Sequence, residues 1–136
     1  MKVVLDTNVV VSGYLNPHGT PGDILARVAS DELILCYDAR VFAEYEEVLH
    51  RPEFDLPEES IRSFLDQLKQ NGEMVAGTLL AKQLPDPDDA PFLEVALAAP
   101  ALLVTGNIKH YPVQCREGVP VLTPAEFLRL RRETQK

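Results

Sequence analysis

Short runs of apolar residues alternate along the chain with segments in which apolar residues recur every three or four positions. The short runs predict strands buried on both faces, because a half-exposed strand would alternate apolar and polar residues. These runs are residues 3–5, 33–37, 102–105 and 119–122, with a weaker candidate at residues 74–76. The pattern therefore predicts several short, buried strands.

Helical spacing of apolar residues marks the segments between these runs. It occurs in residues 24–28, 41–49 and 61–68, and residues 92–99 are apolar on nearly every side. Thr20 and Asp38 are the predicted N-caps of the first two helices. Thr123 and Glu126 form a capping box that opens a last helix. Strand and helix thus alternate through the chain.

This alternation predicts a parallel sheet covered by helices on both faces. In such sheets, ligands bind beyond the carboxyl ends of the strands. Polar residues stand at three of these ends: Asp6 follows the first strand, Asp38 the second, and Asn107 stands close behind the 102–105 strand. We therefore expect the functional site at this edge of the sheet.

Composition is that of a globular protein. The 136 residues, of which 46% are hydrophobic, suffice for a single domain over residues 1–136 with a sizeable core. No apolar run approaches the ~20 residues of a membrane span, and Met1 and Lys2 lead into a strand rather than a secretory leader. Because Cys36 and Cys115 lack metal-binding spacing, a reducing cytoplasm is the expected compartment.

The net charge of −8, from 21 acidic and 13 basic residues, argues against a general nucleic-acid-binding surface, because phosphate contacts need lysine and arginine. It does not exclude an enzyme that acts on nucleic acid. Acids that hold cations add formal negative charge, which the bound metal offsets. Charge alone therefore leaves the substrate undecided.

Carboxylates are the candidate chemistry that remains after other motifs are excluded. The sequence contains neither a glycine-rich phosphate loop nor a serine elbow, and its three histidines lack ligand spacing. The acids in question are Asp6, the glutamates of EYEE at residues 44–47 and the aspartates of DPDD at residues 86–89. Their oxygens suit a hard cation such as Mg²⁺, which often takes one or two carboxylates plus waters.

Each of these acids also has a structural interpretation. Asp6 can cap or turn the backbone. Glu44 and Glu46 lie just outside opposite edges of the helix's apolar stripe, at ~100° per residue, so periodicity does not choose between them. Asp89 is well placed as the N-cap of the helix that contains Phe92. Taken together, on one chain and in one topology, the acids favour a site.

Four stretches, in order along the chain, carry a family resemblance: VVLDTNVVVSGYL, EYEEVLHRPEF, DPDDAPFLEVALAAPALLVTGN and HYP. In this combination they resemble PIN domains and, within that family, the VapC-like toxins of toxin–antitoxin systems. The resemblance extends from about the first residue to the last helix. It implies a three-layer α/β/α sandwich around a mainly parallel sheet of four or five strands. It also implies a Mg²⁺- or Mn²⁺-dependent endoribonuclease that hydrolyses RNA phosphodiester bonds.

The resemblance further implies a set of site residues. The family's acids match Asp6, Glu44 and Asp89, which would be catalytic and would bind the metal. Asn8 and Ser12 match residues that orient the first acid. The resemblance thus assigns a role to one acid from each of the three acidic stretches.

The chain departs from the family where many PIN domains carry a further aspartate, in T-G-D or T-R-N-x-x-D-F. Asn107 and His110 occupy those positions. Asn107 can offer a carbonyl oxygen to the metal but brings no charge, and Lys109 and His110 are candidates for RNA contacts. The resemblance also implies a homodimer and an antitoxin partner, whose basic segment would fill the acidic site.

Two other functions are compatible with the residues. A PIN-like scaffold with a weakened acidic site can serve as an RNA- or protein-binding module, and the missing fourth acid favours that interpretation. A phosphatase of the haloacid-dehalogenase type would use Asp6 as its phosphorylated nucleophile. That fold usually has a second aspartate two residues on, where this chain has Asn8.

Overall fold

Five short parallel strands form the centre of the structure, a computed structural model that describes residues 1–134. The strands lie in the order β3-β2-β1-β4-β5. Their bounds are β1 Lys2–Leu5, β2 Ile34–Tyr37, β3 Glu73–Met74, β4 Leu102–Val104 and β5 Val121–Leu122. All four neighbouring pairs are parallel, as the buried runs predict.

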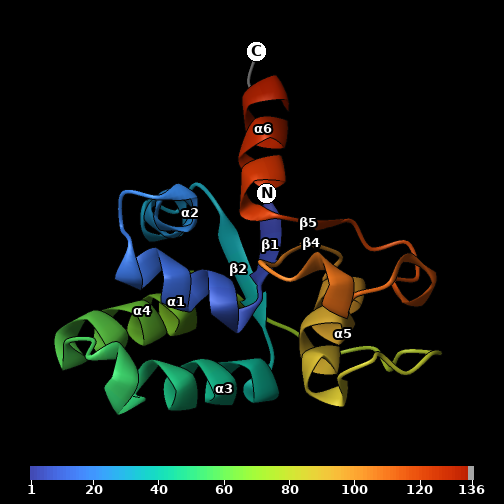
Figure 1. The fold of residues 1–136 in the computed structure, drawn as a ribbon, viewed down its shortest axis with the longest axis horizontal. Helices are drawn as coiled ribbons and strands as arrows, with labels where there is room; N and C mark the ends of the chain where they lie inside the picture. The colour runs from blue at the N-terminus through green and yellow to red at the C-terminus, as the bar shows by residue number, and fades with distance from the viewer. Residues whose placement is uncertain (135–136) are drawn as a thin grey trace.

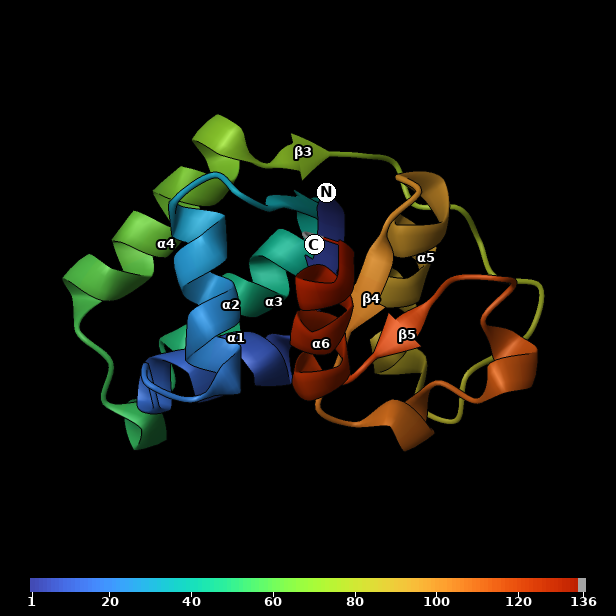
Figure 2. The ribbon, with the colours of Figure 1, turned by 90° about the horizontal axis from the view of Figure 1, so that it is seen from above.

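Six α-helices in the described residues cover this sheet. They are α1 Thr7–Leu15, α2 Thr20–Ala29, α3 Ala39–Leu49, α4 Glu58–Asn71, α5 Ala90–Ala98 and α6 Pro124–Thr134. In both views α1 to α4 lie on one side of the sheet and α5 lies on the other (Figures 1 and 2). The expected three-layer α/β/α arrangement is confirmed.

The central position of β1 decides where a site can form. The chain adds β2 and then β3 on one side of β1, and returns through α5 to place β4 on the other side. The strand order therefore reverses beside β1, and such a switch point is where open α/β sheets bind ligands. Leu5 pairs with Val104 in the register of β1 and β4. The residues that follow these two strands, Asp6 and Thr105, are consequently neighbours.

The α1 helix was not expected from the sequence. Val9, Val10 and Val11 are consecutive and all buried, so the apolar residues form a continuous run without helical spacing. Valine also has a modest intrinsic preference for helix. Packing against α2 and α3 outweighs that preference.

Three predicted caps have different outcomes. The Asp38 carboxylate accepts a hydrogen bond from the Val41 N–H at 2.9 Å, and Thr123 and Glu126 form the capping box, with bonds of 2.9 and 3.1 Å. Thr20 is instead the first residue of α2, and Gly19 is its N-cap. Gly19 itself has an extended backbone conformation, so α2 starts at Thr20, one residue earlier than predicted.

Asp89 precedes α5 without capping it. It ends a 3₁₀ turn, Pro87–Asp89, and has helical backbone angles, φ −82° and ψ −15°. A capping side chain needs an extended backbone to turn back onto the helix, and Asp89 makes no such bond. Its carboxylate is therefore left for other contacts.

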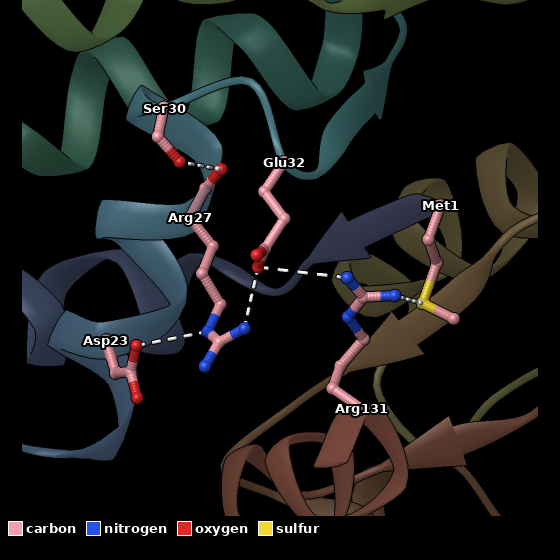
Figure 3. A network of polar contacts seen from close by, with 6 residues as sticks. All are labelled: Met1, Asp23, Arg27, Ser30, Glu32 and Arg131. Atoms are coloured by element: carbon pink, nitrogen blue, oxygen red, sulfur yellow. Dashed lines mark hydrogen bonds and ion pairs between the residues drawn. The ribbon is translucent and has the colours of Figure 1, made fainter. Parts of the chain in front are cut away.

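An ion-pair network fastens α6 to α2 and to the start of β1 (Figure 3). The Glu32 carboxylate lies 2.6 Å from Arg27 and 3.8 Å from Arg131. Arg27 also pairs with Asp23 at 3.1 Å, and Arg131 donates to the Met1 sulfur at 4.0 Å. These contacts attach the last helix to the rest of the fold.

Two further expectations concern residues away from the site. Cys36 is buried within β2 and unpaired, as its apolar surroundings predict, and Cys115 is buried as well. None of the helices within residues 1–134 combines the length and apolar character needed to cross a membrane.

Candidate metal centre

Asp6 is a buried carboxylate at the carboxyl end of the central strand. Its side chain is only 5% exposed, and its backbone N–H extends the sheet by donating to the Val104 carbonyl at 2.9 Å. The Oδ2 atom accepts hydrogen bonds from the hydroxyl groups of Thr105, at 2.9 Å, and Tyr111, at 2.8 Å. Within residues 1–134 no hydrogen bond reaches Oδ1. One oxygen of Asp6 is thus fixed and the other remains available to a ligand.

Glu44 is the member of the EYEE stretch that faces this carboxylate. It is half-buried on α3 and accepts a hydrogen bond from the hydroxyl of Thr7, the first residue of α1. Burial raises the pKa of Glu44, the Thr7 hydrogen bond opposes that rise, and the charges of Asp6 and Asp88 add to it. Glu46 instead points into the groove between α3 and α4. The packing of α3 therefore decides between Glu44 and Glu46, a choice that periodicity leaves open.

Asp89 is the third acid near Asp6. Its side chain is 14% exposed, and its Oδ2 lies 3.0 Å from Nδ1 of His110. Burial, together with the charge of Asp6, raises the pKa of Asp89 from 3.8 to about 6, against an opposing effect of His110. Asp86 has a different role, because its carboxylate accepts from the Asp88 N–H at 2.9 Å and stabilises the turn.

The three acids interact electrostatically, but their side chains do not converge on a single point. The charge of Asp6 raises the pKa of both Glu44 and Asp89. No three Asp, Glu, His or Cys side chains of the described residues are grouped closely enough to hold one metal ion. Mg²⁺ is commonly held by one or two carboxylates plus waters, so the donor set fits such a cation by its chemistry, and the unbonded oxygen of Asp6 is available to it.

Asn8, Ser12 and Asn107 lie together, beside the acids rather than among them. The Asn8 carboxamide oxygen accepts from the Gly106 N–H at 3.0 Å. Ser12 is exposed on α1, and within residues 1–134 neither it nor Asn8 forms a hydrogen bond to Asp6. The side chains of all three line a cavity of ≈ 180 Å³. They do not directly orient the first acid.

Lys109 and His110 lie on a 3₁₀ turn, Ile108–His110, directly behind the loop that follows β4. Both are exposed. His110 contacts Asp89, whereas Lys109 forms no side-chain hydrogen bond or ion pair with any other residue of the described range 1–134. The turn therefore places one cationic side chain and one imidazole at the rim of the acidic site.

Sequence reasoning missed three hydroxyl residues that hold the acids: Thr7, Thr105 and Tyr111. A usable signal existed for Thr105, because strand register places the residue after β4 beside the residue after β1. Thr7 follows Asp6 directly but contacts Glu44, which only helix packing reveals. Tyr111 reaches Asp6 through the path of a loop, and no periodicity encodes such a path.

A second polar cluster, formed by Arg40, Asp38 and Glu94, was also not foreseen. Glu94 is 6% exposed on the apolar helix α5. Its carboxylate lies 2.7 Å from one guanidinium nitrogen of Arg40, and Asp38 lies 2.7 Å from another. Glu94 also accepts from the Leu80 N–H at 3.3 Å. The cluster ties α3, α5 and the loop before α5 together.

Comparison with known proteins agrees with this architecture. A PIN domain family model matches residues 2–109. An uncharacterised protein of Methanocaldococcus jannaschii is 26% identical over 110 residues, which cover 79% of this chain and 71% of that protein. One chain of the crystal structure of VapBC2 from Rickettsia felis, bound to a DNA fragment from its promoter, matches with a TM-score of 0.56 and 20% identity. That match covers 90% of this chain and 98% of the other, and it shows a shared fold. The matched residues make up most of the chain and include Asp6 at the strand end, Glu44 on α3 and Asp89 before α5. This chain therefore belongs to the PIN domain family.

Proposed function

We propose that this PIN domain is a metal-dependent endoribonuclease whose cation binds at the acidic group of Asp6, Glu44 and Asp89, directly to one or two of these carboxylates and through water to the rest. The observation that carries the proposal is the electrostatic relation among these acids. Asp6 is buried at the switch point of the sheet, and its charge raises the pKa of both other carboxyl groups. Carboxylates that repel one another in a partly buried site cost free energy, and such perturbed groups are typical of functional sites. A divalent cation would relieve that repulsion.

The chemistry then follows from the residues around the acids. A bound Mg²⁺ or Mn²⁺ would stabilise the negative charge that develops during phosphodiester hydrolysis and lower the pKa of water. Thr105 and Tyr111 hold one oxygen of Asp6, which directs the other outward, and Thr7 holds Glu44. Lys109, exposed on the neighbouring turn, is placed to contact the RNA backbone, and His110 stands beside it.

The expected partners are RNA and an antitoxin. The net charge of −8 disfavours broad binding to phosphates, so contact with the RNA phosphates would be confined to the cation and the Lys109 turn. Since VapBC2 from Rickettsia felis shares the fold, we propose that this chain is also the toxin of such a pair, and that it forms a homodimer. A basic segment of the antitoxin would complement the acidic site.

The proposal is tested by incubating end-labelled single-stranded and structured RNAs with wild-type protein and with Asp89→Asn, in Mg²⁺, in Mn²⁺ and in EDTA. Asp66→Asn is the matched control, because Asp66 is an exposed acid on α4, far from Asp6 in the sequence and outside the acidic group. We expect wild type and Asp66→Asn to cut RNA only with metal, and Asp89→Asn to lose at least tenfold in rate.

Calorimetric titration with Mn²⁺ gives a second readout that does not depend on the choice of RNA. Wild type and Asp66→Asn should bind with equal affinity, and Asp89→Asn more weakly. Folded wild-type protein that binds RNA but neither Mn²⁺ nor Mg²⁺ would overturn the nuclease and favour the binding-module interpretation.

A further inference from the structure

A small, uncharged pocket adjoins the acidic site. It has a volume of ≈ 180 Å³, and we refer to it as the amide pocket. It is lined chiefly by the polar side chains of Asn8, Ser12 and Asn107 and by the apolar side chains of Val9, Pro21 and Pro124. None of its lining residues carries a charge, although the chain as a whole has a net charge of −8. The lining therefore suits a neutral ligand group better than a phosphate, which would need cationic side chains.

The polar groups of the amide pocket are available for binding. The Asn8 oxygen accepts from the Gly106 N–H at 3.0 Å, which fixes the amide plane and leaves its NH₂ group as a donor. Within the described part of the chain, the side chains of Ser12 and Asn107 form no hydrogen bond. The pocket thus presents one held donor and two further groups that can both donate and accept.

Hydrogen bonds connect the amide pocket to the principal acid. The Asn107 backbone N–H donates to the Thr105 hydroxyl at 3.0 Å, and that hydroxyl donates to Asp6 at 2.9 Å. A single hydroxyl group thus lies between the rim of the pocket and the carboxylate. A phosphodiester positioned for hydrolysis at Asp6 would therefore have an adjacent nucleotide within reach of the pocket.

We propose that the amide pocket binds the base of a nucleotide next to the scissile phosphodiester and so gives the enzyme a base preference. This inference rests on the proposed ribonuclease function. Carboxamide and hydroxyl groups read the edges of unstacked RNA bases, and the valine and two prolines offer an apolar surface for the flat face of the ring. The pocket is smaller than the ~300–1,000 Å³ typical of pockets for drug-sized ligands, and this size suits one base.

The test is to sequence the cleavage products of a randomised single-stranded RNA library. Ser12→Leu fills the pocket from an exposed position on α1, and Ser63→Leu makes the same change at an exposed serine of α4 outside the pocket. We expect wild type and Ser63→Leu to favour one base at one position beside the cut. Ser12→Leu should reduce that preference about tenfold or more, as expected for loss of a base contact, while Mn²⁺ affinity stays at the wild-type value.

If wild type and Ser12→Leu show the same distribution of bases beside the cut, the proposed role of the amide pocket is overturned, while metal-dependent cleavage stands. If wild type cuts no RNA, the proposed function fails. Base binding by the amide pocket is then tested separately, by NMR titration with the four nucleoside monophosphates in EDTA. Selective shifts of the Gly106 amide and the Asn107 side-chain amide with one base would support it. Equal shifts for all four bases, or none at these groups, would overturn it.

Discussion

The hydroxyl of Tyr111 donates a hydrogen bond to Oδ2 of Asp6 at 2.8 Å, although 105 residues separate the two in the sequence. Tyr111 is fully buried. Burial and the charge of Asp6 raise the pKa of the phenol far above its usual value, so the hydroxyl remains a neutral donor at any ordinary pH. Together with Thr105 it determines which oxygen of Asp6 faces outward.

Replacing Tyr111 with phenylalanine removes this donor and preserves the ring. We expect Mn²⁺ affinity to fall several-fold, because Asp6 loses one of the two bonds that hold it. The free energy of unfolding should fall by about 1.5–3 kcal/mol, as for a hydrogen bond to a charged group. Calorimetric titration and urea unfolding measure the two effects. In the control, Tyr14→Phe, the hydroxyl removed has no hydrogen-bond partner among the described residues, and an equal loss of affinity there would contradict the proposed role of Tyr111.

Glu44→Gln and Glu46→Gln form a matched pair on one helix. Glu44 accepts a hydrogen bond from Thr7 and is affected by the charge of Asp6, whereas Glu46 lines the groove between α3 and α4. We expect Mn²⁺ affinity and RNA cleavage to fall at least tenfold in Glu44→Gln and to stay within twofold of wild type in Glu46→Gln. Both variants change the net charge equally, so a loss confined to Glu46→Gln would refute the assignment.

The Asp89 carboxyl group predicts a pH dependence of stability in the absence of metal. Its pKa is about 6 in the folded protein, raised from 3.8, so between these values the folded state binds more protons than the unfolded state. Asp89 therefore contributes stability that is complete below about pH 4 and lost as the pH rises through about 6. The contribution is on the order of 1–3 kcal/mol, since each pKa unit corresponds to about 1.4 kcal/mol and partial exposure reduces the effect.

This dependence is measured by urea unfolding in EDTA at several pH values between 4 and 7. The stability of Asp89→Asn relative to wild type should increase across that range, because the variant has no carboxyl group to deprotonate. Asp66→Asn serves as the control for removal of one charge. A wild type whose advantage over Asp89→Asn grows with rising pH would show that the shift has the opposite sign.

The Arg40 cluster predicts a stability effect outside the metal centre. Arg40→Met removes the ionic partner of Glu94 while keeping much of the side-chain length. Because Glu94 is nearly buried and would lose its charged donor, we expect the free energy of unfolding to fall by about 1–3 kcal/mol. Exposure of half of the Arg40 side chain places the effect below that of a fully buried pair. The double variant Arg40→Met with Glu94→Gln should recover part of the loss, and no recovery would mean that the pair is not the cause.

Local signals in the sequence were sufficient for most secondary structure. Buried strands such as residues 3–5 and 102–105 have no polar alternation, and the Asp38 cap and the Thr123–Glu126 capping box depend on residues at most three positions apart. The expected edge of the sheet at Asp6 follows from strand direction alone. These features were predictable because each depends on nearby residues or on a general rule of parallel sheets. The α1 helix was missed because its apolar residues Val9, Val10 and Val11 form a continuous run that lacks helical spacing.

The sequence by itself determined that Asp6 follows a strand at the carboxyl edge of a parallel sheet, and the family resemblance added a glutamate of residues 44–47 and an aspartate of residues 86–89 as its expected partners. Only the tertiary structure decided which of them face one another. The rotation of α3 selects Glu44, the helical backbone of Asp89 releases its side chain from capping, and the loop after β4 carries Tyr111 back to Asp6. These choices depend on how helices and loops pack against one another. Spacing along one element cannot encode them, because the partner of each side chain belongs to a different element.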